Sequence, residues 1–290
     1  MIMKTKTCLI TGGNSGIGKE AAIQLAEAGF HVIMGARNRK RGENALAEIK
    51  ERANSTAVEL LELDMASKES IVKASKLLNQ QVEKLDVLIH NAADFDISRK
   101  KPDKTVDGIE TIWATNHIGP LLLTNLLLDL LKKSNQGRII TIASQGLVMY
   151  PRLTVDMNDP EFKTRKFSVP LAYYQTKLAQ VMFTYWMAEQ LKESAVTVNC
   201  IRVTNVKVDT NRYPDVSGFM KFLYSLKSRF SISPEEMAKT YTYLATSPEL
   251  EKTTGKYFNE KNKMVLSSPY SMDKKNIDAV MKMSMDYLNY

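Results

Sequence analysis

The chain of 290 residues has few of the side chains that form metal sites or covalent crosslinks. It contains only two cysteines, Cys8 and Cys200, and three histidines, His31, His90 and His117, that lie far apart in sequence. Each cysteine lies in an apolar run, so we expect buried free thiols rather than a disulfide, as is typical of a reducing compartment such as the cytoplasm. Because no Cys/His cluster has ligand spacing, we expect no metal site.

Long hydrophobic runs are also missing. The most apolar segment, residues 120–131, is interrupted by Thr124, Asn125 and Asp129, whereas a membrane-spanning helix needs about 20 apolar residues. The N-terminus leads directly into an apparent strand, without the apolar region and small-residue cleavage site of a signal peptide. We therefore expect a protein without integral membrane association.

Basic side chains are in moderate excess, with a formal net charge of +8, but they form short groups scattered along the chain. These groups lack interleaved aromatic residues and any motif that reads DNA or RNA, so they fit solvated surfaces and we expect no nucleic-acid partner. Peripheral lipid binding through the basic loops and a methionine-rich tail is a weaker alternative.

Short apolar runs alternate with longer segments of helical periodicity, which predicts repeated β-α-β units. The predicted strands are residues 7–11, 31–35, 57–61, 86–90, 137–142, 197–201 and 256–258. The predicted helices are residues 18–28, 40–52, 67–81, 109–131, 173–193, 234–246 and 276–287. The expected fold class is α/β: a single-domain, Rossmann-type, doubly wound parallel sheet of about seven strands with helices on both faces.

Two long irregular segments, 145–170 and 203–232, follow strands at the carboxyl edge of this sheet. Long loops at that edge usually form substrate walls or lids, and we predict that role for both. The whole chain, 1–290, is predicted to be one domain that ends in a helical tail, 267–290. The apolar residues of this tail, Val280, Met281, Met283 and Met285, are expected to pack on the domain or on a neighbour.

The first predicted strand leads into the sequence TGGNSGIG, which begins at Thr11, and a predicted helix follows at once. Glycines let the backbone turn sharply and approach a pyrophosphate, and the helix start offers free N–H groups with a partial positive charge. Such a pattern alone often marks only a tight turn, but its place between the first strand and helix predicts a dinucleotide-binding loop. The residues of this loop that we assign to the cofactor are Gly12, Asn14, Ser15, Gly16, Ile17 and Gly18.

The second predicted strand is followed by Ala36, Arg37 and Asn38. A site selective for NAD would place a carboxylate near this position, where it binds the ribose 2′-hydroxyl and repels a 2′-phosphate. A small residue followed by a guanidinium favours NADP(H) as cofactor, with Arg37 and Asn38 at the 2′-phosphate. The alternative is that these residues only form the solvated basic start of a helix.

Tyr173 is followed four residues later by Lys177, within a predicted helix. This spacing places a phenol and an ammonium on one helix face, one turn apart. Taken alone, the pair could merely line a helix surface. An ammonium about 4 Å from a phenol, at an effective dielectric constant of about 20, supplies roughly the 4 kcal/mol needed to bring a phenol pKa from about 10 to near neutrality. The pair is therefore a candidate acid/base site.

In this order along nearly the whole chain, the motifs resemble those of the short-chain dehydrogenase/reductase family. The segment 11–18 matches the family pattern TGxxxGxG, and Tyr173 with Lys177 matches YxxxK. The resemblance implies further cofactor contacts at Asp64, Met65, Asn91, Ala92 and Ala93. It also implies a catalytic set of Ser144, Asn116, Tyr173 and Lys177, with the last two contacting the cofactor as well. Within the family, the chain looks most like the retinol dehydrogenase and WW-domain oxidoreductase branch, for example at Ala36-Arg37-Asn38 and Lys177-Leu178-Ala179.

The resemblance implies an NADP(H)-dependent oxidoreductase that transfers a hydride between nicotinamide and a carbonyl or alcohol carbon. Ser144 would bind the substrate oxygen, Tyr173 would act as general acid/base, Lys177 would lower the phenol pKa, and Asn116 would hold a water that links Lys177 to solvent. The resemblance implies a small carbonyl or alcohol substrate, for which an apolar aldehyde, ketone or alcohol is one option; the sequence does not identify the compound. The alternative function is a catalytically silent NADP(H)-sensing protein that signals through a partner.

The chain departs from the family pattern in two places. Most relatives have a Pro-Gly pair after the sixth strand, where this chain has Val203 and Thr204, so we assign no cofactor contact there. His90 and Ala93 also replace residues of the family's NNAG.

Two apolar surfaces are candidates for the interface of a homodimer or homotetramer. They are the leucine-rich segment 121–131 and the helix face formed by Leu178, Val181, Met182 and Tyr185. Core packing explains at least half of these residues.

Overall fold

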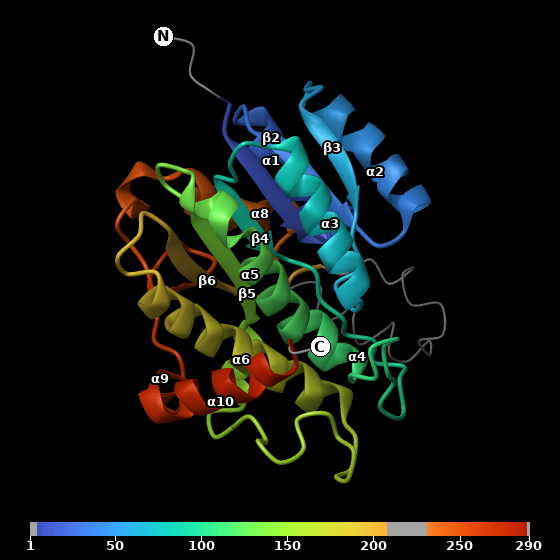
Figure 1. Ribbon diagram of the computed structural model, residues 1–290, viewed down its shortest axis with the longest axis vertical. Coiled ribbons are helices and arrows are strands. Elements are labelled where there is room, and N and C mark those ends of the chain that lie inside the picture. Colours follow the sequence, from blue (N-terminus) through green and yellow to red (C-terminus); the bar gives the residue numbers. More distant parts are fainter. Residues whose placement is uncertain (1–4, 208–230, 289–290) are drawn as a thin grey trace.

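The computed structural model describes residues 5–207 and 231–288 (Figure 1). The central part of the predicted loop 203–232 lies outside the described residues. Seven parallel strands form one sheet in the order β3-β2-β1-β4-β5-β6-β7. They are β1 (Thr7–Thr11), β2 (His31–Ala36), β3 (Val58–Glu62), β4 (Val87–His90), β5 (Arg138–Ser144), β6 (Thr197–Val203) and β7 (Lys256–Phe258). The predicted α/β class and doubly wound parallel sheet are confirmed.

Helices cover both faces of the sheet (Figure 1). They are α1 (Gly16–Glu27), α2 (Arg39–Arg52), α3 (Lys68–Gln81), α4 (Thr111–Trp113), α5 (Gly119–Lys132), α6 (Val169–Gln190), α8 (Pro234–Thr246), α9 (Pro269–Met272) and α10 (Lys274–Asp286). Within the described parts of the chain, no helix combines the length and the apolar character needed to cross a membrane.

Apart from the edge strand β3, whose Glu59 and Glu62 are exposed, the strands are mostly buried on both sides, and alternate residues enter two separate cores. Leu9, Leu88 and Ile139 pack against α3, α5 and α6. Their neighbours Ile10 and Ile89 point the other way and pack against α1, α2 and α8. Burial on both faces explains why the strands read as continuous apolar runs rather than as alternating ones.

The predicted helix 109–131 is interrupted in the structure. It consists of α4, a π-helical turn (Ala114–Ile118) and α5. A π turn inserts one residue into the helical repeat and changes the direction of the side chains around it, a feature that apolar periodicity does not reveal. The turn contains Asn116, whose amide reaches the backbone of Asp94. The interruption thus lies at a predicted catalytic residue.

The C-terminal tail packs on the domain itself, where α9 and α10 lie beside α6 (Figure 1). Val280 and Met281 of α10 are buried in the same core as Leu178 and Met182 of α6. These α6 residues formed part of the predicted oligomer interface, and the structure buries them inside the chain instead. The apolar pattern of α6 is therefore largely explained without a partner, and an oligomer stays a prediction.

Candidate active site

The first functional feature is the turn at the end of β1, where the winding of the sheet reverses. The chain passes from β1 outward to β2, and later returns to place β4 on the opposite side of β1. Ligands of doubly wound sheets bind at such a switch point, beyond the carboxyl ends of the strands. Gly12 and Gly16 have positive φ angles of 65° and 56°, a conformation that residues with a Cβ rarely adopt. The glycines therefore shape the turn at the expected position.

Gly18 is required for close packing below the turn. A Cβ at this position would lie 2.3 Å from Asn91 Nδ2 and 2.6 Å from the Gly12 carbonyl oxygen. Asn91 Nδ2 donates hydrogen bonds to the carbonyls of Thr11 and Gly12, at 3.0 and 3.1 Å, and the Tyr241 hydroxyl donates to Asn91 Oδ1 at 3.2 Å. Asn91 thus ties the end of β4 to the glycine turn.

The start of α1 is suited to an anion. Its N-cap residue, Ser15, makes no side-chain capping hydrogen bond, and the first turn contains no acidic residue. The first N–H groups of a helix have no partner within the helix, and the helix dipole adds partial positive charge there. Together with the glycine turn, this end of α1 fits the diphosphate of a dinucleotide.

A cleft of about 690 Å³ opens above this turn. The predicted cofactor residues that line it are Gly12, Asn14, Ser15, Gly16, Ile17, Gly18, Arg37, Asp64, Met65, Asn91, Ala92 and Ala93. The structure adds residues that sequence reasoning missed, including Leu63, Thr115, Val206, Lys207 and Pro234. No motif marks them, because folding brings them to the cleft from separate segments, among them the π turn that contains Thr115 and the start of α8 at Pro234. Among the described residues, Ser144, Tyr173 and Lys177 do not line this cleft.

The two residues predicted at the ribose 2′ position separate in the structure. Arg37 is exposed and lines the cleft. Asn38 does not line it; its Oδ1 accepts a hydrogen bond from the Arg41 backbone N–H at 2.9 Å and so caps α2. The residue that follows Arg37 thus fixes the start of the helix, and Arg37 alone faces the cleft.

Lys177 is buried on α6, with its ammonium over the phenol ring of Tyr173. Its side chain is 2% exposed, and Nζ donates a hydrogen bond to the Ile142 carbonyl oxygen at 2.9 Å. Nζ lies 5.5 Å from the centroid of the Tyr173 ring, so the predicted one-turn spacing brings the cation over the aromatic ring. Burial lowers the pKa of Lys177 to about 8, which leaves most of the ammonium protonated at pH 7.

Tyr173 is half-buried, and its surroundings connect it to both sides of the site. The Phe95 ring, from the loop after β4, lies 4.4 Å away between centroids. Burial, and secondarily the nearby Tyr173, raise the pKa of Tyr241, the residue whose hydroxyl binds Asn91. Tyr241 itself is on α8 and reaches the end of β4 through Asn91.

Ser144 is the last residue of β5, the strand that also supplies the carbonyl bound by Lys177. Its Oγ accepts a hydrogen bond from the Gly146 N–H at 3.2 Å. The Thr204 hydroxyl, at the position where most relatives have a Pro-Gly pair, donates to Gln145 Oε1. Thr204, which replaces part of the Pro-Gly pair, thus stabilises the segment next to Ser144 through this hydrogen bond.

Asn116 lies in the π turn and is 1% exposed. Its Oδ1 accepts from the Asp94 N–H at 2.6 Å, and its Nδ2 donates to the Asp94 carbonyl at 3.0 Å and to Thr176 Oγ1 at 3.2 Å. The Thr176 hydroxyl in turn donates to the Tyr173 carbonyl at 2.7 Å. Asn116 therefore links the loop after β4 to the turn of α6 that carries Tyr173.

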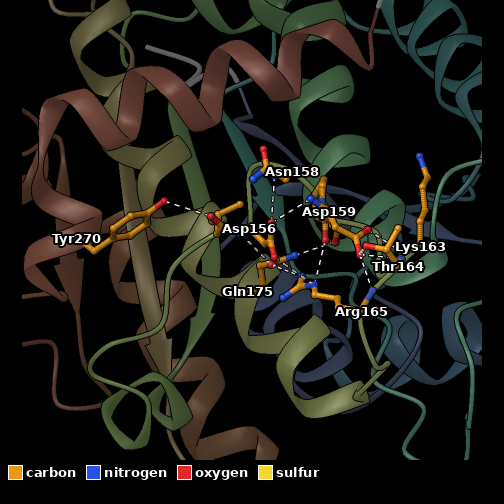
Figure 2. A network of polar contacts seen from close by, with 10 residues as sticks. Asp156, Asn158, Asp159, Lys163, Thr164, Arg165, Gln175 and Tyr270 are labelled. Carbon is orange, nitrogen blue, oxygen red and sulfur yellow. Dashed lines mark hydrogen bonds and ion pairs between the residues drawn. The ribbon is translucent and has the colours of Figure 1, made fainter.

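The predicted substrate wall, 145–170, is ordered by a polar network around Asp159 (Figure 2). The Asp159 carboxylate accepts hydrogen bonds from the backbone N–H groups of Lys163, Thr164 and Arg165. Burial disfavours its charge, but these bonds from Arg165, Thr164 and Lys163 outweigh burial and hold the pKa of Asp159 well below its ordinary value. Gln175 Oε1 accepts from Arg165 Nη2 at 2.7 Å, which ties the loop to α6.

Comparisons with known proteins agree with this arrangement. Residues 6–155 match the family model described as "short chain dehydrogenase". The chain is 36% identical to human (Homo sapiens) retinol dehydrogenase 13 over 257 residues, which cover 88% of this chain and 76% of the relative. It is 37% identical to human retinol dehydrogenase 14 over 273 residues, 89% of this chain and 79% of the relative.

Solved structures share the fold. An uncharacterised protein from Mycobacterium paratuberculosis superimposes with a TM-score of 0.73 at 26% identity, over 97% of this chain and 92% of that one. A short chain dehydrogenase from Shigella flexneri complexed with NADP superimposes with a TM-score of 0.65 at 20% identity, over 88% of this chain and 97% of that one.

The fold, the glycine turn and these matches together define the class: the chain belongs to the short-chain dehydrogenase/reductase family of oxidoreductases, which transfer hydride between nicotinamide cofactors and CH–OH or C=O groups. Its curated relatives place it in the retinol dehydrogenase branch of that family, as the sequence motifs predicted.

Proposed function

We propose that the protein is an NADP(H)-dependent carbonyl reductase or alcohol dehydrogenase in which Tyr173 exchanges the proton. The observation that carries this proposal is the position of the Lys177 ammonium, buried over the ring of Tyr173 and held by the Ile142 carbonyl. A buried cation stabilises a nearby phenolate and so brings the phenol pKa toward the working pH. No comparable pairing would be needed by a silent sensor of the cofactor.

The chemistry of the proposed site follows from the roles of three side chains. A reduced nicotinamide, when bound, supplies the hydride to the carbonyl carbon. The Ser144 hydroxyl holds the carbonyl oxygen, and Tyr173 gives that oxygen its proton, so that a carbonyl becomes an alcohol and the phenol becomes a phenolate. Lys177 stabilises this phenolate until it is protonated again. In the reverse direction, Tyr173 accepts the proton of the alcohol.

Asn116 has a positioning role in this proposal. Both N–H groups of its amide are committed to Asp94 and Thr176, so its side chain holds protein groups in place. The proton relay through a water at Asn116 stays a prediction. Such a water would have to bind the remaining lone pair of Asn116 Oδ1 or the backbone carbonyl of Asn116.

NADP(H) is proposed as the cofactor because of Arg37. Its guanidinium lines the cleft directly after β2, and the preceding residue is the small, buried Ala36. A guanidinium suits a 2′-phosphate, which it can bind with two parallel hydrogen bonds. Structural neighbours complexed with NADP and NADPH are 20% and 21% identical, so they support the fold only and the proposal rests on Arg37.

We propose a reducing compartment such as the cytoplasm as the place of action. Cys8 and Cys200 are both unpaired and buried, and burial raises the pKa of both thiols, that of Cys200 to about 11. Thiols of this kind stay protonated and unreactive at neutral pH. The proposed partner is a small carbonyl or alcohol substrate.

Tyr173→Phe tests the proposal. It removes the proton donor and keeps the ring, so we expect kcat for NADPH-dependent carbonyl reduction to fall by at least about 1000-fold while the Kd for NADPH changes less than about twofold. Tyr185→Phe, which removes a phenol oxygen from the same helix where that oxygen contacts the Ser267 hydroxyl, is the matched control and should retain most activity. A Tyr173→Phe variant with near-normal turnover would contradict the proposal, and a wild-type protein that binds NADPH but reduces no carbonyl would favour the sensor.

A further inference from the structure

Four aromatic rings form a continuous row across the candidate site, and the proposed acid/base is one of them. Phe95 lies 4.4 Å from Tyr173, Tyr173 lies 5.3 Å from Tyr174, and Tyr174 lies 4.8 Å from Tyr150, measured between ring centroids. These separations are those of interacting aromatic pairs. We call these four residues the aromatic row.

The aromatic row is assembled from three separate segments. Phe95 comes from the loop after β4, Tyr173 and Tyr174 from the first turns of α6, and Tyr150 from the end of the short 3-10 turn after β5 (Gln145–Met149). All four rings are half-buried, so each keeps some surface for a ligand. Phe95 and Tyr173 also pack on a small core cluster that contains Ile112 and Val169, which holds this end of the row in place.

One ring of the aromatic row, that of Tyr174, lies against the segment that follows Ser144. A Cβ on Gly146 would lie 2.3 Å from the Tyr174 hydroxyl oxygen, so the Tyr174 ring rests against the backbone of Gly146. The N–H of the same glycine donates to Ser144 Oγ. The row therefore runs from Phe95 to Tyr173, the proposed proton donor, and on to Tyr174, which contacts the segment after Ser144.

A substrate must bring its carbonyl oxygen to Tyr173 and Ser144, so the groups attached to its carbonyl carbon have to lie within a few ångströms of this row. A flat ring in that place gains face or edge contacts with the row that a puckered ring of the same size cannot make, and each aromatic pair contributes about a threefold to tenfold preference. Phe95 adds no hydrogen bond or charge, so a contribution from it would be one of shape and stacking.

We infer that the substrates are aryl carbonyls or the matching benzylic alcohols, and that Phe95 and Tyr174 determine this specificity. The inference rests on the proposed function and narrows it to compounds with an aromatic ring next to the reacting carbon. Reduction of such a carbonyl takes one hydride at carbon and one proton at oxygen and yields the benzylic alcohol.

The test compares benzaldehyde with cyclohexanecarbaldehyde, which have the same carbon skeleton and differ in the flatness of the ring. The measured quantity is the ratio of their kcat/KM values with NADPH, compared between variants so that the difference in intrinsic reactivity of the two aldehydes cancels. Phe95→Leu keeps an apolar side chain and removes the ring, and it should lower the benzaldehyde preference about three- to tenfold. Phe30→Leu is the matched control, because Phe30 directly precedes β2, at the amino end of the sheet, and packs in the core that contains α1, and its ratio should stay within about twofold of wild type.

Tyr150→Leu, at the outer end of the row, provides a second variant in case Phe95→Leu does not fold, and it should change the ratio in the same direction. An unchanged ratio in the row variants, or an equal change in Phe30→Leu, overturns the inference. A wild-type enzyme that reduces cyclohexanecarbaldehyde or linear aldehydes but not benzaldehyde overturns the inference and leaves the proposed function intact. A wild-type enzyme that reduces no carbonyl at all counts against the proposed function itself.

Discussion

The carboxyl edge of the sheet is built in two different ways on the two sides of β4. On the proposed cofactor side, a short glycine turn and a helix start line the cleft, and Asn91 locks this turn to β4. On the proposed substrate side, a long segment is held in place by side chains, through Asp159, Gln175 and the aromatic row. Backbone recognition needs particular residues in a short motif, whereas a wall held by side chains can be built from many sequences. The first side is therefore common to a family, and the second can vary with the substrate.

This comparison can be broken most strongly at Gly18. Gly18→Val places a side chain against Asn91 and the Gly12 carbonyl, so the turn must open. We expect the Kd for NADPH, measured by calorimetry, to rise at least about 1000-fold, which corresponds to about 4 kcal/mol. Gly108→Ala is the control: Gly108 lies outside the turn and has open space around it, and its positive φ of 75°, which Gly18 does not share, means that the substitution strains the backbone without crowding the cleft. Tight NADPH binding by Gly18→Val would show that the cofactor side does not depend on this close approach.

On the proposed substrate side, a substitution at Asp159 should lower the stability of the protein rather than its affinity for the cofactor. Asp159→Asn leaves one acceptor oxygen where three backbone N–H groups and the Thr164 hydroxyl converge on two. Loss of these charge-assisted bonds should lower the free energy of unfolding by about 3 to 4 kcal/mol. Since the pKa of Asp159 is lowered by folding, this contribution is present above the ordinary carboxyl pKa and lost as pH falls below it.

Chemical denaturation at pH 7 and pH 3 measures the effect of Asp159→Asn. Asp156→Asn, in the same loop, is its control: Asp156 Oδ1 accepts from two backbone N–H groups, and an asparagine retains that oxygen. A smaller loss is expected there, about 1 kcal/mol. If Asp159→Asn weakened NADPH binding as strongly as Gly18→Val does, the two sides would not be separable.

Glu110 links the segment 145–170 to the C-terminal helix, and its ionisation makes the stability of this side of the site depend on pH. Its carboxylate accepts from the Trp113 N–H, and its own N–H donates to Glu161, which accepts from the Tyr287 hydroxyl. Burial raises the pKa of Glu110 to about 7. Its contribution to stability is therefore complete below its ordinary pKa and is lost as pH rises through 7.

Glu110→Gln imitates the protonated acid at every pH. Between pH 5 and pH 8, the wild type should lose at most about 3 kcal/mol of unfolding free energy relative to this variant. Parallel urea titrations at the two pH values measure the difference. Equal pH dependence of the two proteins would show that Glu110 does not titrate in this range.

The smallest expected effect concerns Arg37, which sharpens the cofactor side. Arg37→Ala should raise the Kd for NADPH about tenfold, which corresponds to about 1.4 kcal/mol, and leave that for NADH within about twofold. Arg39→Ala is the control, because Arg39 is also exposed on the same segment but pairs with Glu43. Equal losses for the two cofactors in Arg37→Ala would remove the assignment of NADP(H).

The Tyr173–Lys177 pair shows how far local spacing carries a prediction. One helical turn fixes which face both residues share, and the structure places the ammonium over the ring as expected. Helical periodicity failed to predict the interruption in residues 109–131. In the π turn there, Asn116 forms hydrogen bonds with Asp94 and Thr176, which lie far away in sequence. Asn38 likewise read as a cofactor contact and instead caps α2.

The sequence by itself determined the parallel α/β sheet, the glycine turn and the order of the family motifs, because each depends on apolar periodicity or on residues that are neighbours along the chain. Only the tertiary structure decided that α10 covers α6, that Val206 and Lys207 reach the cofactor cleft, and that Phe95 meets Tyr173 in one aromatic row. These contacts join segments separated by long stretches of chain, and no local pattern records which distant partner a side chain will meet.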